Sequence, residues 1–169
     1  AGDLGNRWGQ DGEVGSAGVM YNYDIQQAIP GIAAITRPGS FPLLDELMVG
    51  MPPGIPHPGD TGLTLTEART HFAIWCMMAS PLWLTHDIVN PPPGVTAIVT
   101  NQEIIAINQD PLGHMAVRID GSSESGAGLR KRLPGTCGEG VLWPNGEQLA
   151  RPLANGDWAV LLFNRQSKN

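Results

Sequence analysis

The sequence predicts an α/β fold over its first two thirds and an antiparallel β region after that. Up to residue 112, short apolar segments of strand length alternate with longer segments of helical spacing, which is the pattern of a parallel sheet or barrel. After that point the strand candidates are short, and residues 147–164 are typical of a hairpin joined across residues 154–157. We therefore predict two regions, 1–112 and 113–169.

Three segments of the first region are predicted to be helices. Residues 14–29 have loose helical spacing and end at a Pro-Gly pair. Residues 64–80 have the strongest signal, because Thr64 and Glu67 have the spacing of a capping box just ahead of an apolar run. Residues 94–107 form the third candidate. Its place after a strand candidate continues the alternation of strand and helix.

Two apolar segments, residues 37–50 and 81–87, are predicted to be buried strands. The first of them holds Asp45 and Glu46 side by side. Because successive side chains of a strand point to opposite faces, we expect one of these carboxylates to face the interior or a cleft. An unpaired buried carboxylate is costly, so its presence needs an explanation.

Composition excludes several classes of protein. A hydrophobic fraction of 41% is enough for a core, while 22 Gly and 15 Pro residues indicate many loops. A net charge of −6 and a pI of about 5.0 argue against a nucleic-acid partner. There is no apolar stretch long enough to cross a membrane, so we expect no membrane association.

The His and Cys residues do not indicate a metal or cofactor site. The four His residues lack metal-ligand spacing, and neither a CxxC nor an HExxH motif occurs. We expect His71 to be a core or interface residue. Cys76 and Cys137 could form a disulfide, although the apolar helical run around Cys76 favours a buried free thiol. On periodicity, three tryptophans are predicted to lie in the core: Trp75, Trp83 and Trp158.

Several segments, in order along the chain, resemble the α-galactosidases (melibiases) of glycoside hydrolase family 27. They are "AGDLGNRW", "PGSFPLLDELMVG", "TLTEARTHFAIWCMMASPLWLTHDI", "NQEIIAINQDPLG" and "PLANGDWAVLLFNR". The resemblance implies the last part of a (β/α)8 barrel over residues 1–112, followed by the beginning of an antiparallel β-sandwich domain. It also implies removal of terminal α-galactosyl groups with net retention, with two carboxylates as nucleophile and acid/base.

The same resemblance implies the site residues. Asp3 matches the family's acid/base, and Asp45 matches an aspartate that lines the active-site end of the barrel. Glu46 stands where the family has a Met beside the sugar. Trp8, in a Gly-rich loop near Asp3, is the tryptophan that we expect to stack on a sugar face. The simpler alternatives are a solvated turn for Asp3 and, for Asp45, a loop anchor through Arg37.

The chain also departs from the family's pattern. The Tyr-x-Lys-x-Asp-x-Cys-like motif that carries the nucleophile is absent, and Pro42 and Leu43 replace an Asn-Asp pair. We therefore expect the nucleophile to belong to an N-terminal barrel half, on the same or an associated chain.

The departures leave open an alternative function, a non-catalytic extracellular structural or sugar-binding protein on the same fold. By resemblance we expect a secreted or lysosomal protein, a carbohydrate partner, no cofactor or metal, and a possible homo-oligomer.

Overall fold

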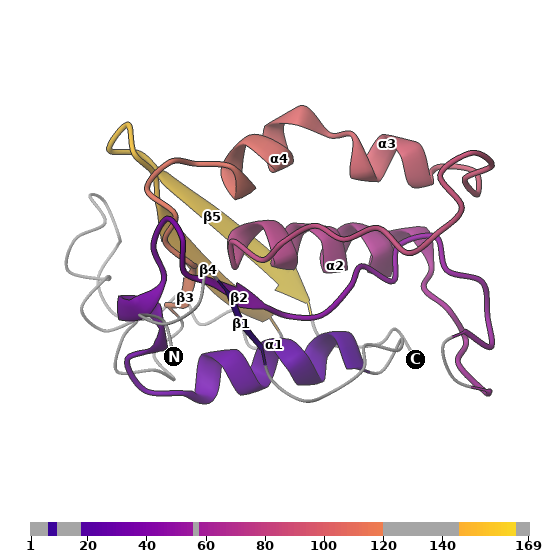
Figure 1. Ribbon diagram of the computed structural model, residues 1–169, viewed down its shortest axis with the longest axis horizontal. Helices are drawn as coiled ribbons and strands as arrows, with labels where there is room; N and C mark the ends of the chain where they lie inside the picture. Colours follow the sequence, from indigo (N-terminus) through magenta and orange to yellow (C-terminus); the bar gives the residue numbers. More distant parts are fainter. Residues whose placement is uncertain (1–6, 10–17, 56–57, 120–145, 165–169) are drawn as a thin grey trace.

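The computed structural model describes residues 7–9, 18–55, 58–119 and 146–164 (Figure 1). In chain order the elements are β1 (Arg7–Gly9), α1 (Gly18–Ala28), a 3-10 turn (Ile32–Ile35), β2 (Phe41–Leu43), α2 (Leu65–Met77), α3 (Val95–Val99), α4 (Gln102–Asn108), β3 (Val117–Arg118), β4 (Gly146–Pro152) and β5 (Trp158–Asn164).

The described strands form two sheets of different type. β1 and β2 are parallel, and Arg7 lies opposite Phe41. β3, β4 and β5 form an antiparallel sheet in that order, with β4 and β5 in a hairpin. The predicted change from parallel to antiparallel pairing is therefore confirmed for the described strands. The observed class is α/β with an added antiparallel sheet.

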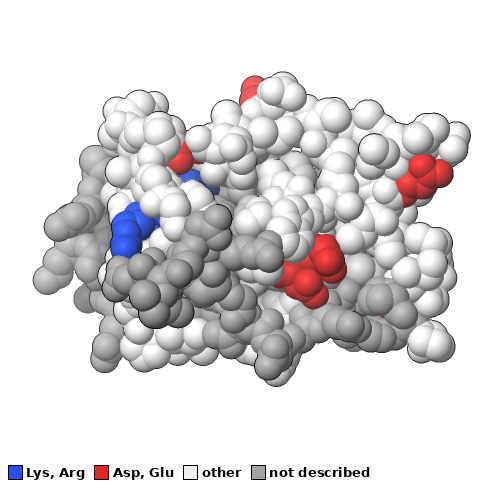
Figure 2. Space-filling view, viewed as in Figure 1, with Lys and Arg blue, Asp and Glu red and all other residues white. Residues whose placement is uncertain are grey.

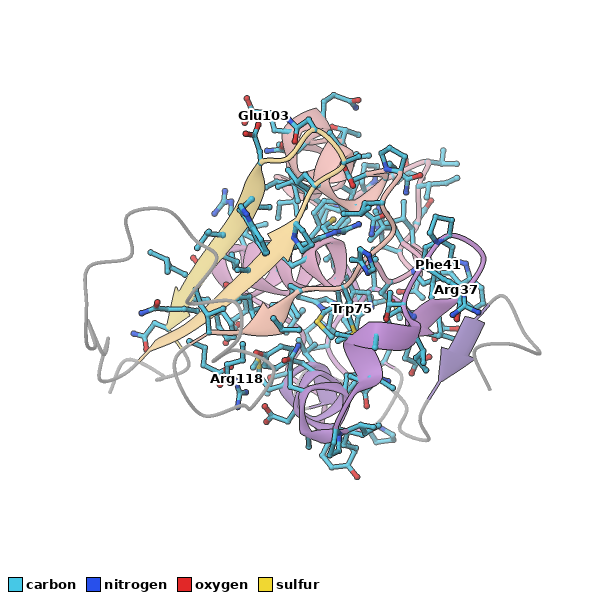
Figure 3. All side chains as sticks on the ribbon, turned by 90° about the vertical axis from the view of Figure 1, so that its left-hand side faces the viewer. Arg37, Phe41, Trp75, Glu103 and Arg118 are labelled. Carbon is cyan, nitrogen blue, oxygen red and sulfur yellow. The ribbon has the colours of Figure 1, made fainter. Side chains whose placement is uncertain are left out.

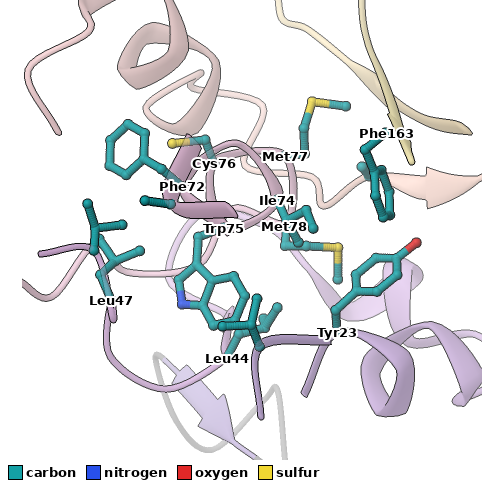
Figure 4. Close-up of a cluster of buried hydrophobic side chains, with 14 of the residues drawn as sticks. Tyr23, Leu44, Leu47, Phe72, Ile74, Trp75, Cys76, Met77, Met78 and Phe163 are labelled. Atoms are coloured by element: carbon teal, nitrogen blue, oxygen red, sulfur yellow. The ribbon is translucent and has the colours of Figure 1, made fainter. Parts of the chain in front are cut away.

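Helix α2 occupies the middle of the molecule, with α3 and α4 on one side of it and β1, β2 and α1 on the other (Figure 1). Its buried side chains form the centre of the main hydrophobic cluster (Figure 4). The cluster also includes Leu44 and Leu47 from the segment after β2 and Phe163 from β5. One core therefore joins the segment after β2 to the antiparallel sheet through α2 and extends across residue 113.

The capping box at the start of α2 is confirmed. The Thr64 hydroxyl accepts a hydrogen bond from the Glu67 amide at 3.3 Å, and the Thr64 amide donates to the Glu67 carboxylate at 2.8 Å. Hydrogen bonds from the Thr64 side chain and backbone lower the pKa of Glu67. Two otherwise unpaired amides are thus satisfied at the first turn.

Thr64→Ala is expected to lower the free energy of unfolding by about 1 kcal/mol, because it removes the N-cap acceptor. Urea denaturation followed by circular dichroism measures the change. Thr66→Ala is the matched control, since Thr66 is exposed within the same helix and its hydroxyl caps nothing. An equal loss in both variants would contradict a specific role for the cap.

Two predictions about the first region were wrong in detail. Residues 81–87 form no strand; they contribute a single parallel bridge between Leu84 and Leu47, and Trp83 and Leu84 are 40% and 42% exposed. Only one neighbouring segment pairs with these residues in the described part of the chain, so the side chains of Trp83 and Leu84 stay exposed. Trp83 is therefore not a core residue, whereas Trp75 is fully buried and Trp158 is partly buried.

The predicted helix at 94–107 is broken into α3 and α4. Thr100 leaves the helical conformation, and the Asn101 side chain accepts a hydrogen bond from the Ile104 amide as the N-cap of α4. Asn is favoured at the N-cap of a helix and disfavoured in its interior. The Asn101 side chain therefore explains why a new helix begins here.

The β4–β5 hairpin is attached to α2 and α4 through Arg151. Its guanidinium is fully buried and donates to the Cys76 carbonyl at 2.7 Å and to the Asn108 carbonyl at 3.4 Å. Both carbonyls lie in the last turns of their helices, where a cation is stabilising. Cys76 is a buried free thiol, as predicted, and Cys137 lies outside the described residues.

Helix α1 is attached to the antiparallel sheet by a polar cluster. The Tyr23 hydroxyl and the Arg118 guanidinium each approach the Glu147 carboxylate at 2.7 Å, and Arg118 also lies over the Tyr23 ring. Burial, together with the hydrogen bond to Glu147, raises the pKa of Tyr23. Figure 3 shows Arg118 beside α1 at the edge of the sheet.

At Gly113, near the boundary between the two regions, the backbone lies very close to that of Arg37 and Pro38. Gly113 has a φ of 66°, and a Cβ there would lie 2.7 Å from the Pro38 nitrogen. Only glycine fits this conformation and this contact. The start of the antiparallel region is thereby held against the loop that leads into β2.

The face seen in Figure 2 carries its described charged side chains in separate spots, without a broad basic patch among them. Within the part of the chain that the structure describes, no helix is both long enough and apolar enough to span a bilayer.

Candidate active site

The parallel pairing brings the loops that follow β2 and the Leu84 bridge to one edge. β1 and β2 run in the same direction, and the Leu47 amide donates to the Trp83 carbonyl at 2.8 Å beside the Leu47–Leu84 bridge. The carboxyl ends of parallel strands meet at one edge, where barrel and open-sheet enzymes place their sites. Figure 1 shows the loops that follow β2 and the bridge at the same end of the molecule.

Asp45 has an unusual backbone conformation at this edge. Its φ is 76°, in the left-handed region, and its side chain is only partly exposed. A non-glycine residue held there costs about 1 to 3 kcal/mol, although Asp tolerates it better than most residues. The other described non-glycine residue of this kind, Ala79, directly follows α2, where such a conformation commonly ends a helix. Asp45 follows a strand, so a helix end does not explain its left-handed conformation.

The left-handed turn corrects the interpretation of residues 37–50 as one strand. β2 ends at Leu43, and alternation stops before the two carboxylates. The side chain directions of Asp45 and Glu46 therefore do not follow from strand geometry. Glu46 is exposed and Asp45 is partly buried, so neither carboxylate lies in the interior.

The backbone of this turn is fixed from several directions by buried side chains. The Trp75 indole donates to the Asp45 carbonyl at 2.8 Å. The Ser80 hydroxyl accepts from the Leu44 amide at 3.1 Å, and the Asn22 side chain donates to the Leu44 carbonyl at 3.1 Å. The turn therefore has bonds to both α1 and α2.

The next residues are held in the same way. His71 accepts a hydrogen bond from the Met48 amide at 2.9 Å through Nε2, and the Thr85 hydroxyl donates to the Leu47 carbonyl at 2.6 Å. His71 is fully buried, and burial lowers its pKa to about 3. It is therefore neutral at physiological pH, as an acceptor nitrogen requires. Its ring packs edge-on to Trp75 with centroids 4.0 Å apart.

The predicted site residues have different outcomes. Asp45 and Glu46 follow β2 at the carboxyl edge. Trp8 lies on β1 opposite Pro42 rather than in a loop, which corrects its predicted setting. Asp3 lies outside the described residues.

Sequence reasoning missed the residues that support the turn. His71 and Trp75 were predicted only as core or interface residues, and Ser80 was not singled out. The available signal was their spacing, since positions four apart on a helix share a face.

Two other features include none of the predicted site residues. A cavity of about 280 Å³ between α2, α3 and α4 has none of the predicted site residues in its lining. His86 is buried, whereas exposed Asp87 accepts hydrogen bonds from the Val89 and Asn90 amides, which lower the pKa of the Asp87 carboxyl. No cluster of three or more His, Cys, Asp or Glu residues suited to a metal occurs among the described residues.

Comparison with known proteins identifies the family. The sequence profile of a melibiase family described as "Alpha galactosidase A" matches residues 18–110. The chain is 32% identical to α-galactosidase A of Cellvibrio japonicus, over 96% of this chain and 35% of that protein. It is 31% identical to human α-galactosidase A, over 80% of this chain and 24% of that protein.

A solved structure agrees with these sequence matches. The α-galactosidase of Saccharomyces cerevisiae with raffinose superposes with a TM-score of 0.61 at 25% identity, covering 86% of this chain and 27% of that one. The chain belongs to the α-galactosidase (melibiase) family, glycoside hydrolase family 27. It spans roughly a quarter to a third of the length of the relatives that it matches.

Proposed function

We propose that the chain is part of a retaining glycoside hydrolase that releases terminal α-galactosyl groups. The observation that carries the proposal is Asp45, an aspartate in a left-handed conformation at the carboxyl edge of parallel strands. Family membership supports the same reaction, because the matched relatives are named as α-galactosidases. The substrate class is a carbohydrate with a terminal α-galactosyl unit.

In this proposal β1, β2 and the segment at Leu84 are the last strands of a (β/α)8 barrel. Residues 1–112 belong to that barrel, and residues 113–169 begin an antiparallel β domain. The parallel pairing of β1 with β2 and the bridge from Leu47 to Leu84 support this order. The remaining strands, and the partner half that carries the nucleophile, are supplied by polypeptide outside these 169 residues.

Asp3 is the proposed acid/base. It protonates the glycosidic oxygen as the nucleophile attacks the anomeric carbon, and a covalent glycosyl-enzyme forms. It then takes a proton from the water that hydrolyses this intermediate, which restores both carboxyl groups and retains the anomeric configuration. The two carboxyl groups of a retaining pair lie about 5 to 5.5 Å apart.

Asp45, Glu46 and Trp8 are the proposed sugar-binding residues. A carboxylate at a cleft accepts hydrogen bonds from sugar hydroxyls, which offsets the cost of partial burial. Glu46 replaces an apolar Met of the family pattern, so it adds an acceptor beside the sugar and changes which sugar fits best. Trp8 offers an apolar face for stacking. We further propose a secreted or lysosomal location and a homo-oligomer, both from the family.

In the full-length enzyme, Asp45→Asn is expected to raise KM for p-nitrophenyl α-galactoside about 10- to 100-fold. The reason is the loss of hydrogen bonds to a charged acceptor, worth about 1.5 to 3 kcal/mol. Asn also tolerates the left-handed conformation, so the turn is preserved.

Asp157→Asn is the control, because Asp157 is an exposed aspartate in the β4–β5 turn. Unchanged KM in Asp45→Asn would contradict the sugar-binding role. A protein that binds galactose and turns over no α-galactoside would instead support a non-catalytic sugar-binding function, to which Pro42 and Leu43 point.

A further inference from the structure

We propose that Trp75 is a positioning residue of the active site, whose indole N–H holds the Asp45 backbone in its left-handed conformation and so orients the Asp45 carboxylate toward the sugar. This inference rests on the proposed function, since it assigns the support of a residue that the proposal places against the substrate. It gives Trp75 a role beyond that of a core side chain.

The hydrogen bond joins two groups that each need a partner. The Trp75 side chain is fully buried in the centre of the core, where its only polar atom is the indole nitrogen (Figure 4). A buried indole N–H requires an acceptor, and the Asp45 carbonyl provides it at 2.8 Å. Figure 3 shows Trp75 between α2 and the segment that follows β2.

The bond acts on the single residue of the turn with an unfavourable conformation. Leu44 is held by Ser80 and Asn22, and Met48 is held by His71, so both flanks of the turn are fixed without Trp75. The tryptophan bond is made to Asp45 itself, where φ is 76°. Its loss therefore keeps the bonds of both flanks and removes a backbone bond from the residue that carries the carboxylate.

The ring of Trp75 is itself held in orientation. His71 packs edge-on against it with an interplanar angle of 83° and centroids 4.0 Å apart. The two side chains come from one face of α2, four residues apart, and their polar atoms reach Asp45 and Met48. α2 thus fixes the turn by a rigid pair rather than by a flexible side chain.

The test is a double-mutant cycle between Trp75 and Asp45, made in the full-length enzyme that includes the nucleophile-bearing half. Trp75→Phe keeps an aromatic ring but removes the donor. Replacement of Trp75 by benzothienylalanine, which has sulfur in place of the N–H, keeps the shape as well and serves if the Phe variant folds poorly. Each is combined with Asp45→Asn, and p-nitrophenyl α-galactoside is the probe.

We expect loss of the donor to lower kcat/KM about tenfold, mainly through KM, because a small misplacement of a binding group is costly. In the Asp45→Asn background the same change is expected to have little further effect, since Trp75 acts through Asp45. Phe163→Leu is the control for core packing. This change removes the aromatic contact between Phe163 on β5 and Tyr23 on α1, and we expect it to lower stability while leaving KM unchanged.

The inference is overturned if the Trp75 and Asp45 effects on kcat/KM add, or if Phe163→Leu raises KM as much as the Trp75 variants do. It is also overturned if a crystal structure of the benzothienylalanine protein keeps Asp45 unmoved. A separate outcome concerns the proposed function. Wild-type KM in Asp45→Asn would remove the sugar-binding role of Asp45, whatever Trp75 does.

Discussion

Asp3→Asn is expected to lower kcat by about 10²- to 10⁴-fold, the usual contribution of a general acid/base. Asn has nearly the shape of Asp but neither donates a proton to the leaving group nor accepts one from water. The loss of kcat/KM is expected to be larger for an α-galactosyl disaccharide than for p-nitrophenyl α-galactoside, because nitrophenolate leaves readily without protonation. Steady-state kinetics with both substrates measure the difference.

Asp11→Asn is the matched control, because Asp11 is another aspartate of the same Gly-rich opening segment. It should retain wild-type kcat on both substrates. An Asp3→Asn protein that hydrolyses the disaccharide at the wild-type rate would show that Asp3 is not the acid/base. The reaction would then need another proton donor.

His71 is expected to make the protein less stable as the pH falls. Burial lowers its pKa from 6.5 to about 3, so between these values the unfolded chain binds a proton at this residue that the folded chain does not. The free energy of unfolding therefore rises with pH through this window, by about 1.4 kcal/mol per pH unit. Neutral His71 makes its full contribution to stability above pH 6.5, and lowering the pH to 3 removes about 4 to 5 kcal/mol of the free energy of unfolding.

Urea denaturation at several pH values between 7 and 4 tests this, with His71→Gln as the comparison. The Gln amide oxygen accepts a hydrogen bond from the Met48 amide but does not titrate. The difference between the two proteins in pH slope isolates the histidine from the carboxylates. Parallel stability curves for the two proteins would mean that His71 titrates in the folded state as it does in the unfolded chain.

The elements that the sequence predicts correctly are those with local causes. α2 has a capping box at Thr64 and Glu67 and a long apolar run, and both signals lie within the helix itself. The hairpin of β4 and β5 is likewise set by a turn and two adjacent runs. The break between α3 and α4 also had a local signal, the N-cap residue Asn101, which the apolar spacing on either side obscured.

The elements predicted wrongly depend on distant residues. The exposure of Trp83 and Leu84 depends on which strands lie beside them, and pairing partners do not follow from an apolar run. The conformation of Asp45 depends on a tryptophan thirty positions away in the chain. Strand alternation over residues 37–50 therefore did not predict how the Asp45 and Glu46 side chains are oriented, because the strand ends at Leu43.

The candidate site itself was found through resemblance rather than through physical pattern. Nothing about a lone aspartate among glycines distinguishes Asp3 from a solvated turn. Asp45 stands out only when its φ of 76° is known. The supporting residues His71 and Trp75 were visible as a helix face, but their hydrogen bonds to Met48 and Asp45 could not be inferred from spacing alone.

The central claim is that the protein is a retaining enzyme acting on α-galactosides, and proton NMR of the first product tests it most directly. The protein as isolated from its source is mixed with p-nitrophenyl α-galactoside, and the anomeric signals are followed before mutarotation. We predict that α-galactose appears first and converts slowly to the equilibrium mixture, and that Asp3→Asn releases it at least 100-fold more slowly, about the lower bound for loss of a general acid/base. Initial release of β-galactose, or no release by a folded protein, would contradict the account.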